Sequence, residues 1–164
     1  MKPDFELECK RYGGIGHSFV NKIKIADYLC QAASIYLDEY GYECIYYNKN
    51  IFEEFLNFFY AASKQIHSAE LCIKEEIPRI KECSKDDICR SLDQVKAASS
   101  LCDTVYEEYF NDKSSKSIFS DIDNFGDFLY FFLSIRDHIS AAETFIKEEI
   151  PLATKYHQTR AYYV

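Results

Sequence analysis

Apolar residues recur at alternating intervals of three and four along four long stretches of the chain. In the first stretch, about residues 18–40, they are Phe19, Ile23, Ala26, Cys30, Ala33, Leu37 and Tyr40. This spacing is typical of an amphipathic helix that packs against antiparallel neighbours. The same spacing predicts helices over about residues 51–77, 85–111 and 124–150. We expect the segment from Tyr42 to Lys49 to be a connection.

Local residue types predict where these helices begin and end. Side-chain acceptors favour helix starts, whereas glycine and proline favour helix ends. The expected starts are Asn50 paired with Glu53, Ser84, and Asp123. The expected ends are Gly41, Pro78 and Pro151.

The chain contains one segment twice. Phe55 to Pro78 and Phe128 to Pro151 align without a gap, 73 residues apart, and are identical at 13 of 24 positions. About one or two matches would arise by chance at a background identity of roughly 6 % per position, so this is an internal repeat.

The repeat, with four helices of matched length, predicts an all-α fold. We expect an up-down-up-down four-helix bundle built from a tandemly duplicated helical hairpin. Residues 1–164 would form a single domain, with repeat 1 at about 18–78, repeat 2 at about 84–151, an N-terminal loop at 1–17 and a C-terminal tail at 152–164.

Composition narrows the function classes. The chain is 48 % hydrophobic and carries a net charge of −8, which fits a folded domain and argues against general nucleic-acid binding. The seven cysteines lack any C-x-x-C pair, so we expect reduced thiols. The start of the chain resembles no signal peptide and no apolar run is long enough to cross a membrane. These features predict a cytoplasmic protein without membrane contact.

In an up-down-up-down bundle, much of the acidic charge falls at one end, which we call the acidic pole. Its twelve acidic residues are Asp38, Glu39, Glu43, Glu53, Glu54, Asp103, Glu107, Glu108, Asp112, Asp121, Asp123 and Asp127. Three lysines accompany them (Lys49, Lys113 and Lys116), which leaves a charge of −9 at the pole. The remaining 15 acidic and 16 basic residues give +1. Tyrosines are abundant in the same segments.

A field of one sign speeds encounter with a partner of opposite charge, and tyrosine supplies contact area and a hydroxyl. The sequence therefore predicts a non-enzymatic module that captures a basic protein, with no cofactor, no metal, no catalytic residue and no nucleic-acid partner. The expected partner-binding residues are Asp38, Glu39, Glu43, Tyr46, Tyr47, Glu53, Glu54, Glu107, Glu108, Asp121 and Asp123.

The helices, the acidity and the string Ile45-Tyr46-Tyr47 between helices resemble the colicin-type nuclease immunity proteins, over a handful of residues. This resemblance implies an immunity or inhibitor protein for a cationic toxin or nuclease.

Two enzymatic alternatives remain open. The equivalent Glu70 and Glu143, with His67, resemble part of a ferritin-like di-iron site, although we expect both glutamates to lie on a solvated flank as i,i+4 partners of lysines. The spacing of Arg11 and His17 resembles that of the HEPN ribonucleases. A third alternative is a structural module or homodimer assembled through exposed aromatic residues, namely Phe58, Tyr60, Tyr130 and Phe131.

Overall fold

The computed structural model describes the backbone of residues 17–76 and 82–162, and the side chains of residues 19–72 and 89–146. The helices are α2 (His17–Tyr40), α3 (Tyr42–Tyr47), α4 (Lys49–Glu76), α5 (Glu82–Glu108) and α6 (Ile122–Tyr162). These described ranges contain no strand, so the prediction of an all-helical protein is confirmed for them.

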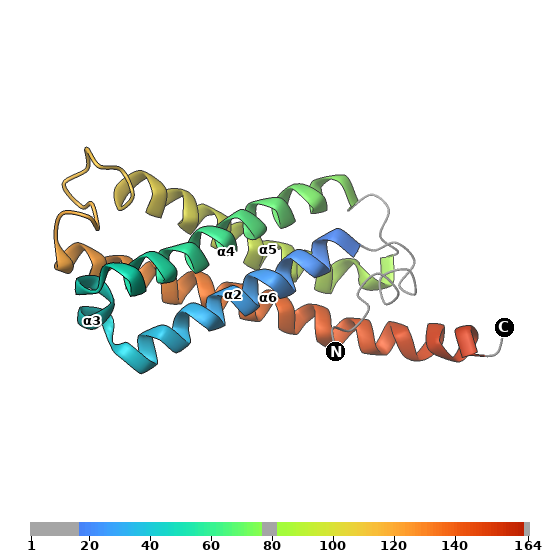
Figure 1. Ribbon diagram of the computed structural model, residues 1–164. Coiled ribbons are helices and arrows are strands. Elements are labelled where there is room, and N and C mark those ends of the chain that lie inside the picture. The colour runs from blue at the N-terminus through green and yellow to red at the C-terminus, as the bar shows by residue number, and fades with distance from the viewer. Residues whose placement is uncertain (1–16, 77–81, 163–164) are drawn as a thin grey trace.

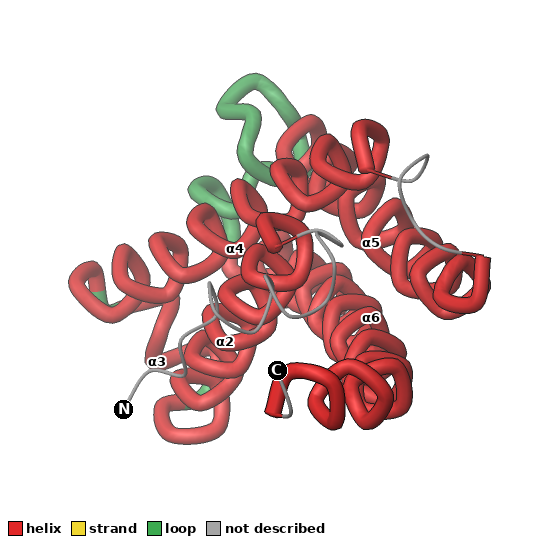
Figure 2. The backbone as a smooth tube through the Cα atoms, turned by 90° about the vertical axis from the view of Figure 1, so that its right-hand side faces the viewer, coloured by secondary structure: helices red, strands yellow, loops and turns green. Residues whose placement is uncertain are grey.

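The four long helices lie alongside one another (Figure 1) and are seen closer to end-on in Figure 2. The most extensive contacts join α2 to α4 and α5 to α6. Smaller interfaces join α2 to α6 and α4 to α5. The structure therefore consists of two closely packed helix pairs that meet along two lighter interfaces.

Several helix ends gather at the left of Figure 1. They are the C-terminal end of α2, the N-terminal ends of α4 and α6, and the short α3 between α2 and α4. The loop from α5 to α6 lies at the same end. This arrangement positions the candidate site described below.

The predicted apolar positions form the core. Of the seven named for the first helix, Leu37 is half-buried, Tyr40 is exposed and the other five are buried. The largest fully buried side chains come mainly from α4 and α6, whose phenylalanines meet across the interior. Phe132 of α6 packs edge-on against Phe55 and Phe59 of α4, with ring centroids 5.5 Å and 6.2 Å apart.

Glycine ends α2 as predicted. Gly41 has a φ of 76°, in the region that glycine adopts without steric cost. Its N–H donates a hydrogen bond to the Leu37 carbonyl oxygen at 2.9 Å. The chain can therefore turn sharply from α2 into α3.

Three predicted helix starts are wrong by two residues or more. Asn48, not Asn50, caps α4, because its Oδ1 accepts a 3.3 Å hydrogen bond from the Ile51 N–H. Asp121, not Asp123, caps α6, because its Oδ1 accepts a 3.0 Å hydrogen bond from the Asp123 N–H. Ser84 lies inside α5, which begins at Glu82. Where polar residues cluster, several can cap a helix, and the tertiary structure selects one.

Two predicted irregular segments are helical. Most of the expected connection forms α3, with Ile45 fully buried and Tyr46 half-buried against the core.

The expected tail at 152–164 is instead the continuation of α6 to Tyr162, which extends past the helix body (Figure 1). Proline removes one hydrogen bond and bends a helix without always ending it. The helix-forming residues Leu152 and Ala153 follow Pro151 and favour continuation. The described part of α4 runs to Glu76, and the expected stop at Pro78 lies outside the described residues.

The two described glycines should respond in opposite ways to alanine. A Cβ at Gly126, inside α6, would meet nothing within 4 Å, so Gly126→Ala should stabilise the protein by about 0.5–1 kcal/mol through lower unfolded-state entropy. Gly41→Ala should destabilise it by about 1 kcal/mol, because alanine disfavours the positive φ. Urea unfolding midpoints measure both, and a shift of the same sign in the two variants would contradict this account.

Truncating a core ring should be costly. Phe132 is fully buried, so Phe132→Ala should lower the free energy of unfolding by about 3–5 kcal/mol through lost burial and a cavity. The matched control is Tyr130→Ala on the same helix, where the side chain is 76 % exposed and the change should stay within about 0.5 kcal/mol. Comparable losses in denaturant unfolding would show that the core does not lie where the structure has it.

Candidate functional site

The eleven residues expected to bind a partner come from five helices or their flanks. Asp38 and Glu39 lie in the last turn of α2, and Glu107 and Glu108 in the last turn of α5. The others lie on α3, near the start of α4, or at the start of α6, and are Glu43, Tyr46, Tyr47, Glu53, Glu54, Asp121 and Asp123. These segments lie toward the same end of the molecule (Figure 1). Of the eleven side chains, Tyr46 and Glu108 are half-buried and the others are exposed.

One acidic residue assigned to the pole from the sequence lies elsewhere. The Asp103 carboxylate is 3.5 Å from His67 Nε2, near the middle of α4. The reason is register, because Tyr106 in the last turn of α5 packs against Phe59 and Tyr60 rather than against the start of α4. The loop after α5 reaches the start of α4, where Phe119 packs 6.2 Å from Phe52.

Tyrosine hydroxyls and carboxylates pair directly at the pole. The Tyr36 hydroxyl donates a 2.6 Å hydrogen bond to Glu54 Oε2, which links α2 to α4. The Tyr42 hydroxyl donates a 3.4 Å hydrogen bond to Glu43 Oε1. A phenol that donates to a carboxylate resists ionisation. Each hydrogen bond also orients its carboxylate.

Nearby carboxylates help to raise the pKa values of three tyrosines at the pole. The hydrogen bond to Glu54 is the main cause that raises the pKa of Tyr36 above its ordinary value of 10.0. The charge of Glu43 is the main cause at Tyr42, with burial second and Asp123 contributing further. Burial chiefly raises the pKa of Tyr46, and Asp121 adds to it. Carboxylates of α3, α4 and α6 thus act on tyrosines of α2 and α3.

The two predicted partner-binding tyrosines have different surroundings. Tyr46 packs against Phe52 and Phe125, with ring centroids 5.4 Å and 5.6 Å apart, and so fastens α3 to α4 and α6. Tyr47 is 74 % exposed and touches Tyr46 edge-on. Tyr47 is therefore the one free to meet a partner.

Few basic groups neutralise the pole. Within the described residues, Glu108 pairs with Lys116 at 3.6 Å, while the ion pairs His67–Asp103 and Arg136–Asp137 lie along the helix bodies. The last turns of α2 and α5 hold no basic residue. The carboxylates at these C-terminal ends oppose the helix dipoles, so helix stability does not explain them.

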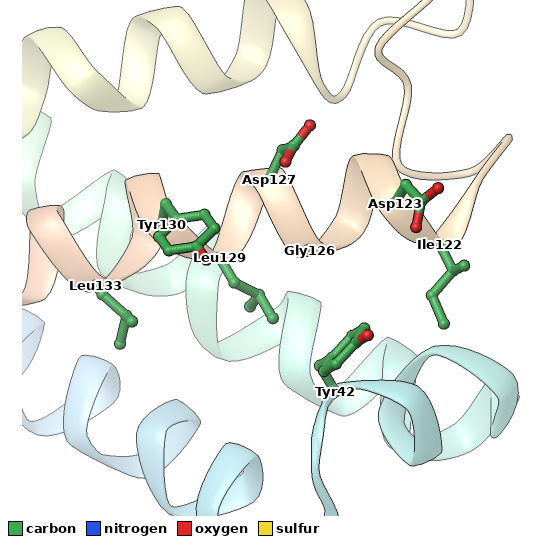
Figure 3. A pocket seen from close by; sticks show the side chains of 8 residues that line it. All are labelled: Tyr42, Ile122, Asp123, Gly126, Asp127, Leu129, Tyr130 and Leu133. Atoms are coloured by element: carbon green, nitrogen blue, oxygen red, sulfur yellow. The ribbon is translucent and has the colours of Figure 1, made fainter.

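An open groove of about 500 Å³ lies between α3 and α6 at the same end. Ile122, Leu129 and Leu133 project from the side of α6 on which Tyr42, at the start of α3, lies (Figure 3). The other lining residues are Asp123, Gly126, Asp127 and Tyr130. The groove is not evident from the sequence, because it depends on α3 being a helix that packs beside α6.

The glutamates of the ferritin-like alternative differ from each other. Glu70 is half-buried, and Glu143 is 8 % exposed, so the prediction that Glu143 lies on a solvated flank is wrong. Ser140, one helical turn away, faces Asp27 of α2 with a 2.9 Å hydrogen bond, so this part of α6 packs against a neighbour. Among residues with described side chains, no three His, Cys, Asp or Glu side chains come together as a metal site.

A Ser–His–Asp arrangement joins α4 and α5. His67 Nδ1 lies 2.8 Å from Ser99 Oγ, and His67 Nε2 lies 3.5 Å from Asp103 Oδ1. Ser99 is buried, at 3 % exposure, whereas a nucleophile must face the substrate. The arrangement serves as a polar contact between the two helices.

The structure describes all the aromatic residues of the assembly alternative, but only part of the Arg11 and His17 pair of the HEPN-like alternative. Arg11 lies outside the described residues, and His17 begins α2 while its side chain is outside them. Of the four aromatics proposed for assembly, Phe58 and Phe131 are half-buried, Tyr60 is 36 % exposed and stacked on Tyr106, and Tyr130 is strongly exposed.

Comparison with protein-family models, with curated proteins and with solved structures found no match. None of the helices, as far as the structure describes them, combines the length and apolar character needed to cross a membrane.

The Tyr36–Glu54 hydrogen bond predicts how the pKa of Tyr36 responds to a substitution of Glu54. In Glu54→Gln the pKa of Tyr36 should fall toward 10.0, because the charged acceptor that favours the neutral phenol is gone. The matched control is Glu53→Gln, which removes the same charge one residue away. The hydrogen bond favours the protonated phenol of Tyr36 in the folded state. Its contribution to stability is therefore complete below pH 10 and is lost as the pH rises through the folded-state pKa of Tyr36. Titration of the tyrosine ring carbons by NMR measures the pKa, and equal shifts in both variants would contradict the assignment.

Proposed function

We propose that this protein is a non-enzymatic binding module that captures a basic protein partner through the acidic pole. The single observation that carries the proposal is the convergence of largely unneutralised carboxylates and tyrosines from α2, α3, α4, α5 and α6. Surface charge of one sign raises the association rate with an oppositely charged protein. Exposed tyrosines such as Tyr47 and Tyr130 supply contact area at low entropic cost.

We further infer that the fold is an up-down-up-down four-helix bundle derived from a duplicated hairpin. The 13 identities in 24 positions support this. Burial at equivalent positions of the repeat also supports the duplication. Phe55 and its counterpart Phe128 are both buried, as are Phe59 and its counterpart Phe132. In that topology, two inter-helix turns and their flanking carboxylates share one pole.

One specific form of this function is an immunity or inhibitor protein for a cationic toxin or nuclease. Such an inhibitor needs fast association and a charged interface that excludes other partners, and the acidic pole suits both needs. We place this activity in the cytoplasm, where the free thiols of Cys30, Cys44, Cys72, Cys89 and Cys102 would persist.

Charge reversal tests the proposal. The double variant Glu53→Lys, Glu107→Lys alters the pole, whereas Asp93→Lys, Asp137→Lys makes the same charge change at exposed sites on the helix bodies. At low salt, association with an oligolysine peptide should slow on the order of tenfold in the first variant and much less in the second. Stopped-flow fluorescence measures the rates. Equal slowing would mean that net charge alone, and not the pole, governs capture.

A further inference from the structure

We propose that the groove between α3 and α6 binds a short segment of the basic partner in which an arginine is flanked by an apolar residue. This inference rests on the proposed function and assigns to one part of the acidic pole a specific role. The groove combines an apolar wall, two tyrosines and a carboxylate rim, and these three features match the parts of such a segment.

The apolar wall suits the stem and the flanking residue. Leu129 is 8 % exposed and forms the floor, while Ile122 and Leu133 are half-buried beside it. All three point to the side of α6 that faces Tyr42 (Figure 3). Arginine buries its methylene stem along apolar surface while its charged head stays near water. A volume of about 500 Å³ leaves room for a neighbouring side chain as well.

The rim suits the guanidinium. Asp123 lines the groove and is exposed, and its charge acts on the Tyr42 hydroxyl. Glu43 accepts the hydrogen bond of that same hydroxyl, so a second carboxylate lies on the α3 side. A guanidinium between them would form charge-assisted hydrogen bonds. The planar guanidinium also stacks on aromatic faces, which Tyr42 and Tyr130 provide. This planarity favours arginine over lysine.

Gly126 keeps the groove open. It lies in the middle of the lining segment of α6, where a Cβ would meet nothing within 4 Å. Glycine inside a helix costs about 1 kcal/mol relative to alanine. Its φ is not positive, so backbone conformation does not require glycine here, and the open surface it leaves is what a side chain would fill.

The experiment uses the full-length protein and a capped peptide Gly-Leu-Arg-Leu-Gly. The comparison peptide replaces arginine with citrulline, which has nearly the same shape and no charge. Binding is followed by NMR amide shifts and by the dissociation constant. We expect the shifts to centre on residues 122–133 and the citrulline peptide to bind at least about fivefold more weakly, which corresponds to about 1 kcal/mol.

Four variants separate the contributions. Asp123→Asn should weaken the arginine peptide about fivefold and leave the citrulline peptide nearly unchanged. Gly126→Leu fills the groove and should abolish binding of both peptides, while an unchanged or raised melting temperature shows that the fold is kept. Glu107→Gln removes a charge of the pole outside the groove and should have a smaller effect than Asp123→Asn. Asp93→Asn on the body of α5 serves as the neutral control.

The outcomes distinguish this inference from the proposed function. If Glu107→Gln and Asp123→Asn weaken the peptide equally and Gly126→Leu changes nothing, the groove proposal fails while capture by the pole stands. If the protein alone forms a dimer that Gly126→Leu dissociates, the groove binds a second copy of this chain, and the proposal is overturned. If neither the arginine peptide nor oligolysine binds, the proposed function fails as well.

Discussion

The structure depends on the packing of phenylalanine rings from α4 against those from α6. Phe55 and Phe59 of α4 contact Phe128 and Phe132 of α6 in four edge-to-face pairs, with centroids between 5.1 Å and 6.5 Å apart. Edge-to-face pairs add a specific attraction to the area they bury. The closest packed pairs are α2 with α4 and α5 with α6, so α4 and α6 belong to different pairs. Their rings meet across the centre of the molecule and tie the two pairs together.

This packing constrains the other two long helices. The interior positions of α2 and α5 hold mainly small residues, among them Ala26, Cys30, Ala98 and Cys102, all of them fully buried. Small side chains on one diagonal leave room for the large ones on the other. Burial raises the pKa of the Cys30 and Cys102 thiols to about 12, so these cysteines stay protonated and act as small apolar residues.

Polar contacts at the two lighter interfaces set the register. Ser140 donates to Asp27 at 2.9 Å between α6 and α2, and His67 meets Ser99 at 2.8 Å between α4 and α5. A half-buried hydrogen bond costs free energy if a helix slides by one residue and leaves its partner behind. The register then decides which carboxylates reach the pole, and it places Asp103 beside His67 instead. The pole follows from helix register as much as from composition.

The sequence by itself determined the helices, their buried faces and the end of α2, because these follow from local periodicity and residue type. It also indicated a concentration of acidic residues near particular helix ends, including Glu43, Glu54, Asp121 and Asp123. Only the tertiary structure decided that Tyr42–Tyr47 is a helix and that Glu143 is buried. The groove between Tyr42 and Leu129 likewise joins residues far apart in the chain. Such features depend on how helices are placed against each other, and a helix periodicity specifies which face is buried without specifying the neighbour that covers it.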